Sequence, residues 1–460
     1  MLTSTEGWGL AVAAISIVWA VLMIRKGPRI ALGIAVVLSF AFPTWVKVDI
    51  AGLPFDIRTT VLCISLLGYA FHPQGKIVSP LTMLDVCIGL LFLIHVSADT
   101  FVTGFSAGLP FAAYGEWVLP YVAGRFAVRD NEDLRRLAPW IAGVLIVVGL
   151  GACVETATAT NVFEFIFGDR PEGLSPRTIQ RFGFKRAFGT TRHAIYLGML
   201  LLVMMPWLVV LWQSYLSKRV RTIVILTGLV ATIGMTCTFS RTPVLSLLAA
   251  TTLFTAVRYK VLRWPLGIVT TLMLGVFAMF PNQVVDKISV WTGGGHRVRL
   301  VEVDGKAVET SSSRSRLTIF RASSKAMLKA GPFGFGSKAV STFPPQIPYM
   351  EGKAEASDAM KIIDNGYILL TLRLGWLGGA GLLLLYVTAI ISSVSLHLHN
   401  PGQLFPAALG CTFFVISTFS MLLIWMSYDF GLEILWTTGI LAGLLSSRNK
   451  NHRSRILARR

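Results

Sequence analysis

Arginines beside apolar stretches are the residues of this chain best suited to chemistry. Arg186 and Arg192 precede the apolar stretch 194–213, and Arg241 stands at the start of the stretch 242–257. A guanidinium group binds phosphate oxygens through paired hydrogen bonds. The helix expected after Arg241 would add backbone amides that favour an anion. These residues are therefore candidates for binding a phosphorylated ligand, and anchoring at the membrane interface is the alternative for the segment that holds Arg186 and Arg192.

Arg316 lies in a stretch that predicts a helix over 313–329, ended by Gly331-Pro332. At about 100° per residue, Arg316 shares the apolar face of this helix, and four other cations form a stripe on the opposite face. The apolar face carries Phe320, Ser323 and Met327, and the stripe carries Arg314, Arg321, Lys325 and Lys329. An inward arginine needs an anionic partner, because burying an unpaired charge is costly. Either a distant carboxylate or an anionic ligand would meet that need.

The segment Asp364-Asn365-Gly366-Tyr367 opens another apolar stretch, at 366–392. Asp364 is placed to cap the helix, which is one interpretation of it. The other interpretation follows from its expected position at the same surface as the arginines. A carboxylate beside cations stays ionised, and it could remove a proton from a hydroxyl group.

Two further candidates are Glu116 and His193. Glu116 lies inside the apolar stretch 108–125, and an ionisable group within a membrane is a functional candidate by default. His193 directly follows Arg192. The histidines show no spacing typical of metal ligands, so the sequence predicts no metal site.

The composition places most of the chain in lipid. Hydrophobic residues make up 54% and charged residues 14%, whereas soluble domains carry about 25% charged residues. These values exclude a disordered chain, a soluble nucleotide-binding enzyme and a secreted disulfide scaffold. The net charge of +19 fits basic loops near anionic lipid or an anionic substrate. Nucleic acid is not expected as a partner, because there is no soluble basic domain to bind it.

Apolar stretches of roughly the length that crosses a bilayer recur along the chain. They are centred on 9–24, 30–46, 58–72, 82–98, 108–125, 137–155, 194–213, 222–238, 242–257, 264–281, 366–392, 404–425 and 432–446. We therefore predict an all-α polytopic membrane protein with 12 or 13 transmembrane helices. Short basic loops, and the basic tail, all fall on one side if the helices alternate, which makes that side the cytoplasm.

The predicted organisation has four parts. N-terminal transmembrane helices occupy 1–155, and an outer loop with central transmembrane helices occupies 156–281. A large outer loop follows at 282–365, and C-terminal transmembrane helices with a basic cytoplasmic tail occupy 366–460. In the large loop, residues 301–308 alternate around Asp304-Gly305, which predicts a β-hairpin. Short helices are expected beside it.

Four patches, in this order, resemble the O-antigen ligase and Wzy-type polysaccharide polymerase superfamily. They are Arg186-x-x-Gly189, then Ser240-Arg241, then Arg316-Leu-Thr-Ile-Phe320 with Gly331-Pro332-Phe333-Gly334-Phe335-Gly336, and finally Asp364-Asn365-Gly366-Tyr367 with Gly375-Trp376-Leu377-Gly378. The resemblance covers about residues 180–380. This chain departs from the family at Asp364, where the ligases often have His.

The resemblance implies a GT-C-type, metal-independent inverting glycosyltransferase of the bacterial inner membrane, with its active site facing the periplasm and no cofactor. Its donor is a glycan on undecaprenyl diphosphate, its acceptor is a saccharide, and other polysaccharide assembly proteins are further partners. Carried over by position, Arg186, Arg241 and Arg316 hold the diphosphate and Asp364 is the catalytic base. Arg192, Asn365 and Tyr367 would join them in binding the substrate.

Three functions remain open at this point. Polymerisation of exopolysaccharide or O-antigen repeats is the first, and ligation of a finished chain to lipid A–core is the second. A flippase or other transporter of lipid-linked saccharides is the third. Transporters tend to show internal repeats and ionisable sites at the membrane midplane, whereas this chain shows no repeat and its cations gather at one face.

Overall fold

The computed structural model describes residues 4–50, 53–73, 75, 80–170, 180–181, 183–268, 299–303, 306–310, 326–341, 365–422 and 427–457, together with Leu272, Ser323 and Met279. The predicted span at 264–281 and the large loop at 282–365 lie largely outside these residues. So do Arg316 and Asp364, the two site residues predicted from that loop.

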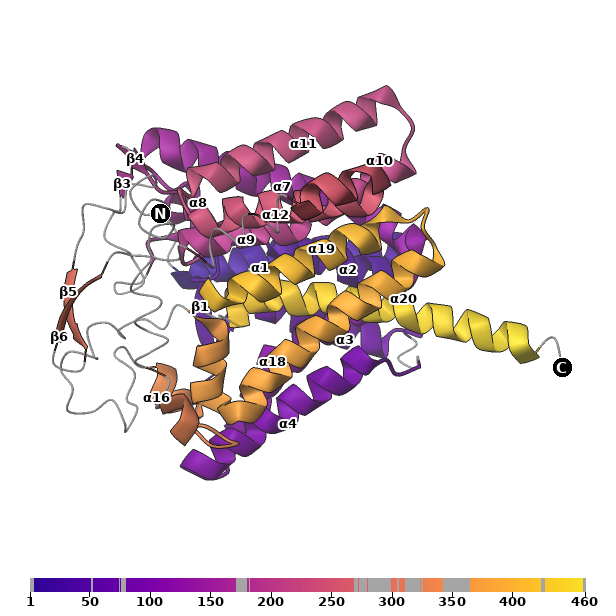
Figure 1. The fold of residues 1–460 in the computed structure, drawn as a ribbon. Helices are drawn as coiled ribbons and strands as arrows, with labels where there is room; N and C mark the ends of the chain where they lie inside the picture. The colour runs from indigo at the N-terminus through magenta and orange to yellow at the C-terminus, as the bar shows by residue number, and fades with distance from the viewer. Residues whose placement is uncertain are drawn as a thin grey trace.

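Helices dominate the described residues and lie side by side in one bundle (Figure 1). In chain order they are α1 (Ser4–Lys26), α2 (Pro28–Ser39), α3 (Ile57–Phe71), α4 (Met83–Thr103), α5 (Gly108–Ala113), the π-helix η1 (Tyr114–Val118), α6 (Leu119–Ala127), α7 (Asn131–Thr158), α8 (Val162–Phe167), α9 (Ala194–Met204), α10 (Pro206–Ser214), α11 (Lys218–Cys237), α12 (Arg241–Arg258), α16 (Gly336–Ser341), α18 (Gly366–His399), α19 (Leu404–Phe419), the π-helix η4 (Ser427–Gly431) and α20 (Leu432–Leu457). Short 3₁₀ turns follow α12, at Lys260–Leu262, and α19, at Ser420–Leu422.

Seven helical segments of the described chain are long and apolar enough to cross a membrane. They are Thr5–Lys26, Met83–Thr103, Asn131–Thr158, Ala194–Ser214, Lys218–Cys237, Gly366–His399 and Asp429–Arg448. Three shorter apolar helices, α2, α3 and α19, accompany them. The predicted all-α polytopic membrane fold is confirmed.

Three two-stranded hairpins lie at one end of the bundle, which we call the loop end (left in Figure 1). They pair β1 (Lys47–Ile50) with β2 (Leu53–Asp56), β3 (Gln180–Arg181) with β4 (Phe184–Lys185), and β5 (Arg299–Val303) with β6 (Lys306–Thr310). In the third hairpin Val303 pairs with Lys306, which confirms the hairpin predicted around Asp304-Gly305. We call the opposite end, where α20 projects, the tail end.

A network of polar contacts anchors the tail end. Thr82 and Asp85 form a capping box at the start of α4, and the carboxylate of Asp85 also pairs with Arg125 at 2.6 Å. The hydroxyl of Tyr121 donates to the same carboxylate at 2.8 Å. Asp85 therefore links α4 to α6, and its role is structural.

Candidate functional site at the loop end

Arg186 joins the loop before α9 to the junction of α11 and α12. Its side chain is buried, with 4% exposed. Its Nε donates to the carbonyl oxygen of Thr238 at 2.9 Å, and its Nη2 donates to Ser240 Oγ at 2.6 Å. Ser240 is the N-cap of α12, and Arg241 is the first residue of that helix. The structure thus brings the first two patches of the family motif into direct contact.

The buried carboxylate of Glu155 fixes the Arg186-x-x-Gly189 loop. Its Oε2 accepts hydrogen bonds from the backbone amides of Phe188 and Gly189, at 2.9 and 2.8 Å, and from Asn161 Nδ2 at 3.1 Å. Gly189 has a φ of 53°, which favours glycine at this turn. Sequence reasoning missed Glu155, although a carboxylate at the end of an apolar stretch was a signal of the same kind as Glu116.

Other arginines gather around this loop. Arg170 contacts Glu164 and Glu155, and its guanidinium lies 4.4 Å from the ring centroid of Phe188. Arg181 donates to the carbonyl oxygen of Phe239 at 2.7 Å, and Arg192 donates to that of Thr44 at 2.8 Å. Arg186 and Arg192 therefore belong to a larger cationic cluster, which also contains Arg170 and Arg181.

His193 lies in this cluster as an uncharged helix cap. Its Nδ1 accepts the backbone amide proton of Ile195 at 3.2 Å and so caps α9. Burial lowers the pKa of His193 to about 4, and the charges of Arg186, Arg170 and Arg181 act in the same direction. At neutral pH the ring is therefore uncharged, and its proton must sit on Nε2 because Nδ1 is an acceptor.

Burial also lowers the pKa of Arg186, to about 10, and the charge of Arg181 adds to the effect. This pKa still lies well above neutrality, so Arg186 keeps its positive charge. A guanidinium has five N–H groups. Two of those in Arg186 donate to Thr238 and Ser240, and no other described residue is seen to accept from the remaining three.

Glu116 belongs to a separate buried cluster. Both of its oxygens accept from Arg373, at 2.8 and 2.7 Å. The same guanidinium donates to Ser337 Oγ at 2.6 Å and contacts His95 Nε2 at 3.0 Å. Because both oxygens of Glu116 are engaged, the geometry favours a structural ion pair for this residue. Sequence reasoning missed Arg373, which lies 257 residues from Glu116.

The third and fourth patches of the motif pack against each other at a kink in α18. Gly375, with a φ of 76°, interrupts the helix. Beside this kink the amide of Phe335 donates to the carbonyl oxygen of Leu372 at 2.8 Å, and the amide of Trp376 donates to that of Gly331 at 2.9 Å. A Cβ at Gly375 would collide with the backbone of Pro332. The two glycine-rich patches therefore form one tight joint.

The N-cap of α18 is Asn365 and not Asp364. Asn365 Oδ1 accepts from the amides of Tyr367 and Ile368, both at 3.0 Å. The capping interpretation of Asp364 is therefore wrong. Tyr367 directs its hydroxyl to the carbonyl oxygen of Ser417 at 2.9 Å, which ties it to α19.

Arg316 and Asp364 lie outside the described residues, but two neighbours of Arg316 on the predicted helix do not. Ser323 is buried, and Met327 packs on the small apolar cluster of Ala326, Ile368 and Leu372. Both residues belong to the face assigned to Arg316. Gly331 has a φ of 61° and lies two residues after Lys329, the last of the helical residues 326–329, which agrees with the predicted helix end.

Residues 226–383 match the family model of the O-antigen ligases. This match confirms the resemblance over that part of the chain, which includes Arg241, Asn365, Tyr367 and Arg373. No curated protein matches the chain. The match supports a membrane enzyme that ligates or polymerises glycans.

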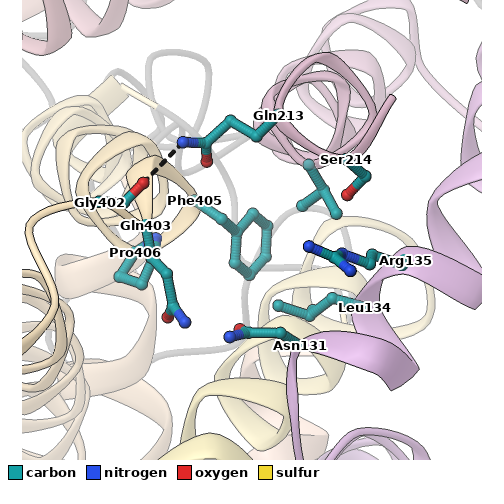
Figure 2. Close-up of a pocket in the computed structure, with 10 residues that line it drawn as sticks. Asn131, Leu134, Arg135, Gln213, Ser214, Gly402, Gln403, Phe405 and Pro406 are labelled. Atoms are coloured by element: carbon teal, nitrogen blue, oxygen red, sulfur yellow. Dashed lines mark hydrogen bonds between the residues drawn. The ribbon is translucent and has the colours of Figure 1, made fainter. Parts of the chain in front are cut away.

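A pocket of about 230 Å³ lies at the tail end, between α7, α10 and α19 (Figure 2). Arg135 and Asn131 line it, and Gln213 closes one side by donating to the carbonyl oxygen of Gly402 at 2.7 Å. This pocket is at the opposite end of the bundle from Arg186. It is therefore separate from the arginine cluster.

Proposed function

We propose that this protein is an inverting GT-C-type glycosyltransferase that polymerises oligosaccharide repeats carried on undecaprenyl diphosphate. One observation carries the proposal, namely that the buried Arg186, within a cluster of arginines, donates a hydrogen bond to Ser240, the N-cap of α12. A diphosphate is the leaving group whose charge such a cluster would neutralise. The family match at 226–383 supports the same class of reaction.

In the proposed reaction the acceptor hydroxyl attacks the anomeric carbon of the donor sugar. The new C–O bond forms while the bond from that carbon to the diphosphate oxygen breaks, and its electron pair leaves with the diphosphate. Arg186, Arg241 and Arg316 stabilise the developing charge, and Arg192 and the Nε2–H of His193 assist. Asp364 takes the hydroxyl proton. Asn365, the next residue in the sequence, caps α18.

We also propose that the loop end faces the periplasm in the inner membrane. The basic residues Arg25, Lys26, Arg136 and Lys218 lie at helix ends of the tail end, which the positive-inside rule assigns to the cytoplasm. A cysteine introduced in β1 should then react with an impermeant maleimide in intact spheroplasts, whereas one at Arg136 should react only after lysis.

Ligation of a finished glycan to lipid A–core is the second candidate, and the name of the matched family favours it. The glycans of a deletion strain separate the two reactions. Loss of a polymerase leaves single repeats, whereas loss of a ligase leaves long chains on undecaprenyl diphosphate. Loss of a flippase would leave the lipid-linked saccharide on the cytoplasmic leaflet.

The basic stripe should matter much less than Arg316. Changing Arg321, Lys325 and Lys329 together to Gln should leave most of the activity, because these side chains are expected on the solvated face of the loop helix. Arg316→Gln should abolish activity, since it removes a diphosphate contact. Polymer length in a complemented deletion strain measures both. The opposite ranking would mean that the helical phase is wrong.

Transfer should not need a metal ion, because the arginines already supply positive charge to the leaving group. Purified protein treated with EDTA should keep its full rate, measured as the release of undecaprenyl diphosphate. A rate that falls with EDTA and returns with Mg²⁺ or Mn²⁺ would contradict this expectation.

A further inference from the structure

Three fully buried ionisable residues meet at the loop end of α20. Arg58 and Asp429 have no exposed surface, and Glu433 is 1% exposed. Arg58 Nη1 pairs with Glu433 Oε1 at 3.0 Å, and Arg58 Nη2 donates to the carbonyl oxygen of Phe40 at 3.3 Å. Asp429 lies four residues before Glu433, in the π-helix η4 that runs directly into α20, and it is close enough for its charge to act on Glu433.

The carboxylates outnumber the cations in this group. Neither oxygen of Asp429 has a hydrogen-bond partner among the described residues, and the same is true of Glu433 Oε2. With both acids ionised, the group would carry one uncompensated negative charge in the protein interior. Burying such a charge is strongly unfavourable, and buried polar atoms almost always have a partner.

The elements packed around η4 offer no second cation. Besides α20, η4 contacts α9 and η1, neither of which contains Lys, Arg or His. Their titratable residues are Tyr196 on α9 with Tyr114 and Glu116 on η1. Glu116 is already engaged by Arg373. Three further elements, α6, α18 and α4, pack on α20, and their cations Arg125, Arg373 and His95 contact Asp85, Glu116 and Asp99. Arg58 is therefore the one cation that these described elements and α3 leave to the acid pair.

Arg58, the partner of Glu433, is linked to the loop that holds Arg186. The carbonyl oxygen of Phe40 accepts both from Arg58 and from Thr190 Oγ1, the latter at 3.4 Å. Thr190 follows Gly189 in the motif, and its carbonyl oxygen accepts from the amide of Thr44 at 3.0 Å. A single carbonyl thus connects Arg58 to the loop that holds Arg186.

We propose that Asp429 and Glu433 bind one proton between them, and that this proton keeps the interior beside the loop that holds Arg186 electrically neutral. The proton makes Asp429 a donor to Glu433 Oε2, which gives a partner to that atom and to one of the two Asp429 oxygens and leaves Glu433 to balance Arg58. Loss of the proton would place a negative charge beside the loop and weaken its binding of an anion. The anion-binding part of this inference rests on the proposed function.

Infrared spectroscopy of the full-length protein in lipid nanodiscs tests the proton itself and needs no turnover. The wild-type protein should show the carbonyl band of a protonated buried carboxyl group, shifted in D₂O, and Asp429→Asn should remove that band. Asp49→Asn, which changes an exposed residue of β1, is the matched control and should keep it. A band that survives in Asp429→Asn would overturn the proposal.

The affinity for undecaprenyl diphosphate tests the electrostatic role. In the wild type it should fall by about tenfold between neutral pH and a mildly alkaline pH that stays below the pKa of Arg186 of about 10, since one charge acts across an interior with an effective dielectric constant of about 20. Asn in place of Asp429 mimics the protonated acid, so Asp429→Asn should lose most of this pH dependence. A variant that keeps the wild-type dependence would refute this role. If wild-type protein binds no undecaprenyl diphosphate at all, the proposed function is wrong, and so is this electrostatic role. The infrared result still shows whether Asp429 and Glu433 share a proton.

Discussion

Arg186→Lys should abolish glycan transfer, although the charge is kept. The guanidinium of Arg186 makes two hydrogen bonds in fixed directions, to Thr238 and Ser240, and in the proposed reaction its further N–H groups bind the diphosphate. A lysine ammonium cannot reproduce this fork. Loss of one preorganised contact to a developing negative charge typically costs about 2.7–4 kcal/mol, which corresponds to roughly a hundredfold to thousandfold lower rate.

The rate of undecaprenyl diphosphate release by purified protein measures this effect. Arg136→Lys is the matched control, because Arg136 is half-exposed at the tail end in a surface pair with Glu132. It should retain the wild-type rate. If the Arg186→Lys protein inserts and purifies normally and keeps near-normal activity, Arg186 does not bind the diphosphate.

Asp364→Asn should reduce turnover by about 10²–10⁴-fold, the usual contribution of a general base. The start of α18 should not suffer, because Asn365 supplies the cap through Tyr367 and Ile368. Binding of the lipid-linked donor should persist, since the arginines are unchanged. Single-turnover rates and donor affinity, measured on the same protein preparation, separate these two effects.

Asn365→Ala provides the contrasting control for Asp364. It removes the cap, worth about 1 kcal/mol of helix stability, without touching the proposed base. It should lower thermal stability more than Asp364→Asn does, and lower turnover less. If Asp364→Asn makes normal polymer, another carboxylate must be the base. A carboxylate of the segment 351–358 is then a better candidate than Glu116, because both oxygens of Glu116 already accept hydrogen bonds from Arg373.

Local features of the sequence predicted local features of the structure well. The Asp304-Gly305 turn predicted the hairpin of β5 and β6, because that dipeptide suits a tight turn between alternating strands. Gly331 marked the end of the helical residues 326–329. The apolar stretches predicted the helical bundle, since a bilayer requires such segments.

Features that depend on how helices pack were not predictable from one sequence. Glu155 contacts a loop 33 residues away, and Arg373 pairs with Glu116 across 257 residues. Periodicity does not encode such pairings. The cap of α18 was misplaced by one residue because Asp and Asn cap helices about equally well, so only the backbone decides between them. The kink at Gly375 arises from its contact with the 331–336 turn, which belongs to another segment.

The most direct test of polymerisation uses purified full-length protein in a bilayer with a single repeat on undecaprenyl diphosphate as both donor and acceptor. The account predicts a ladder of products that grow by whole repeats, with one undecaprenyl diphosphate released for each bond formed. Arg186→Lys should give no ladder. A wild-type protein that leaves the single repeat unchanged, or that transfers it only when lipid A–core is added, would contradict polymerisation.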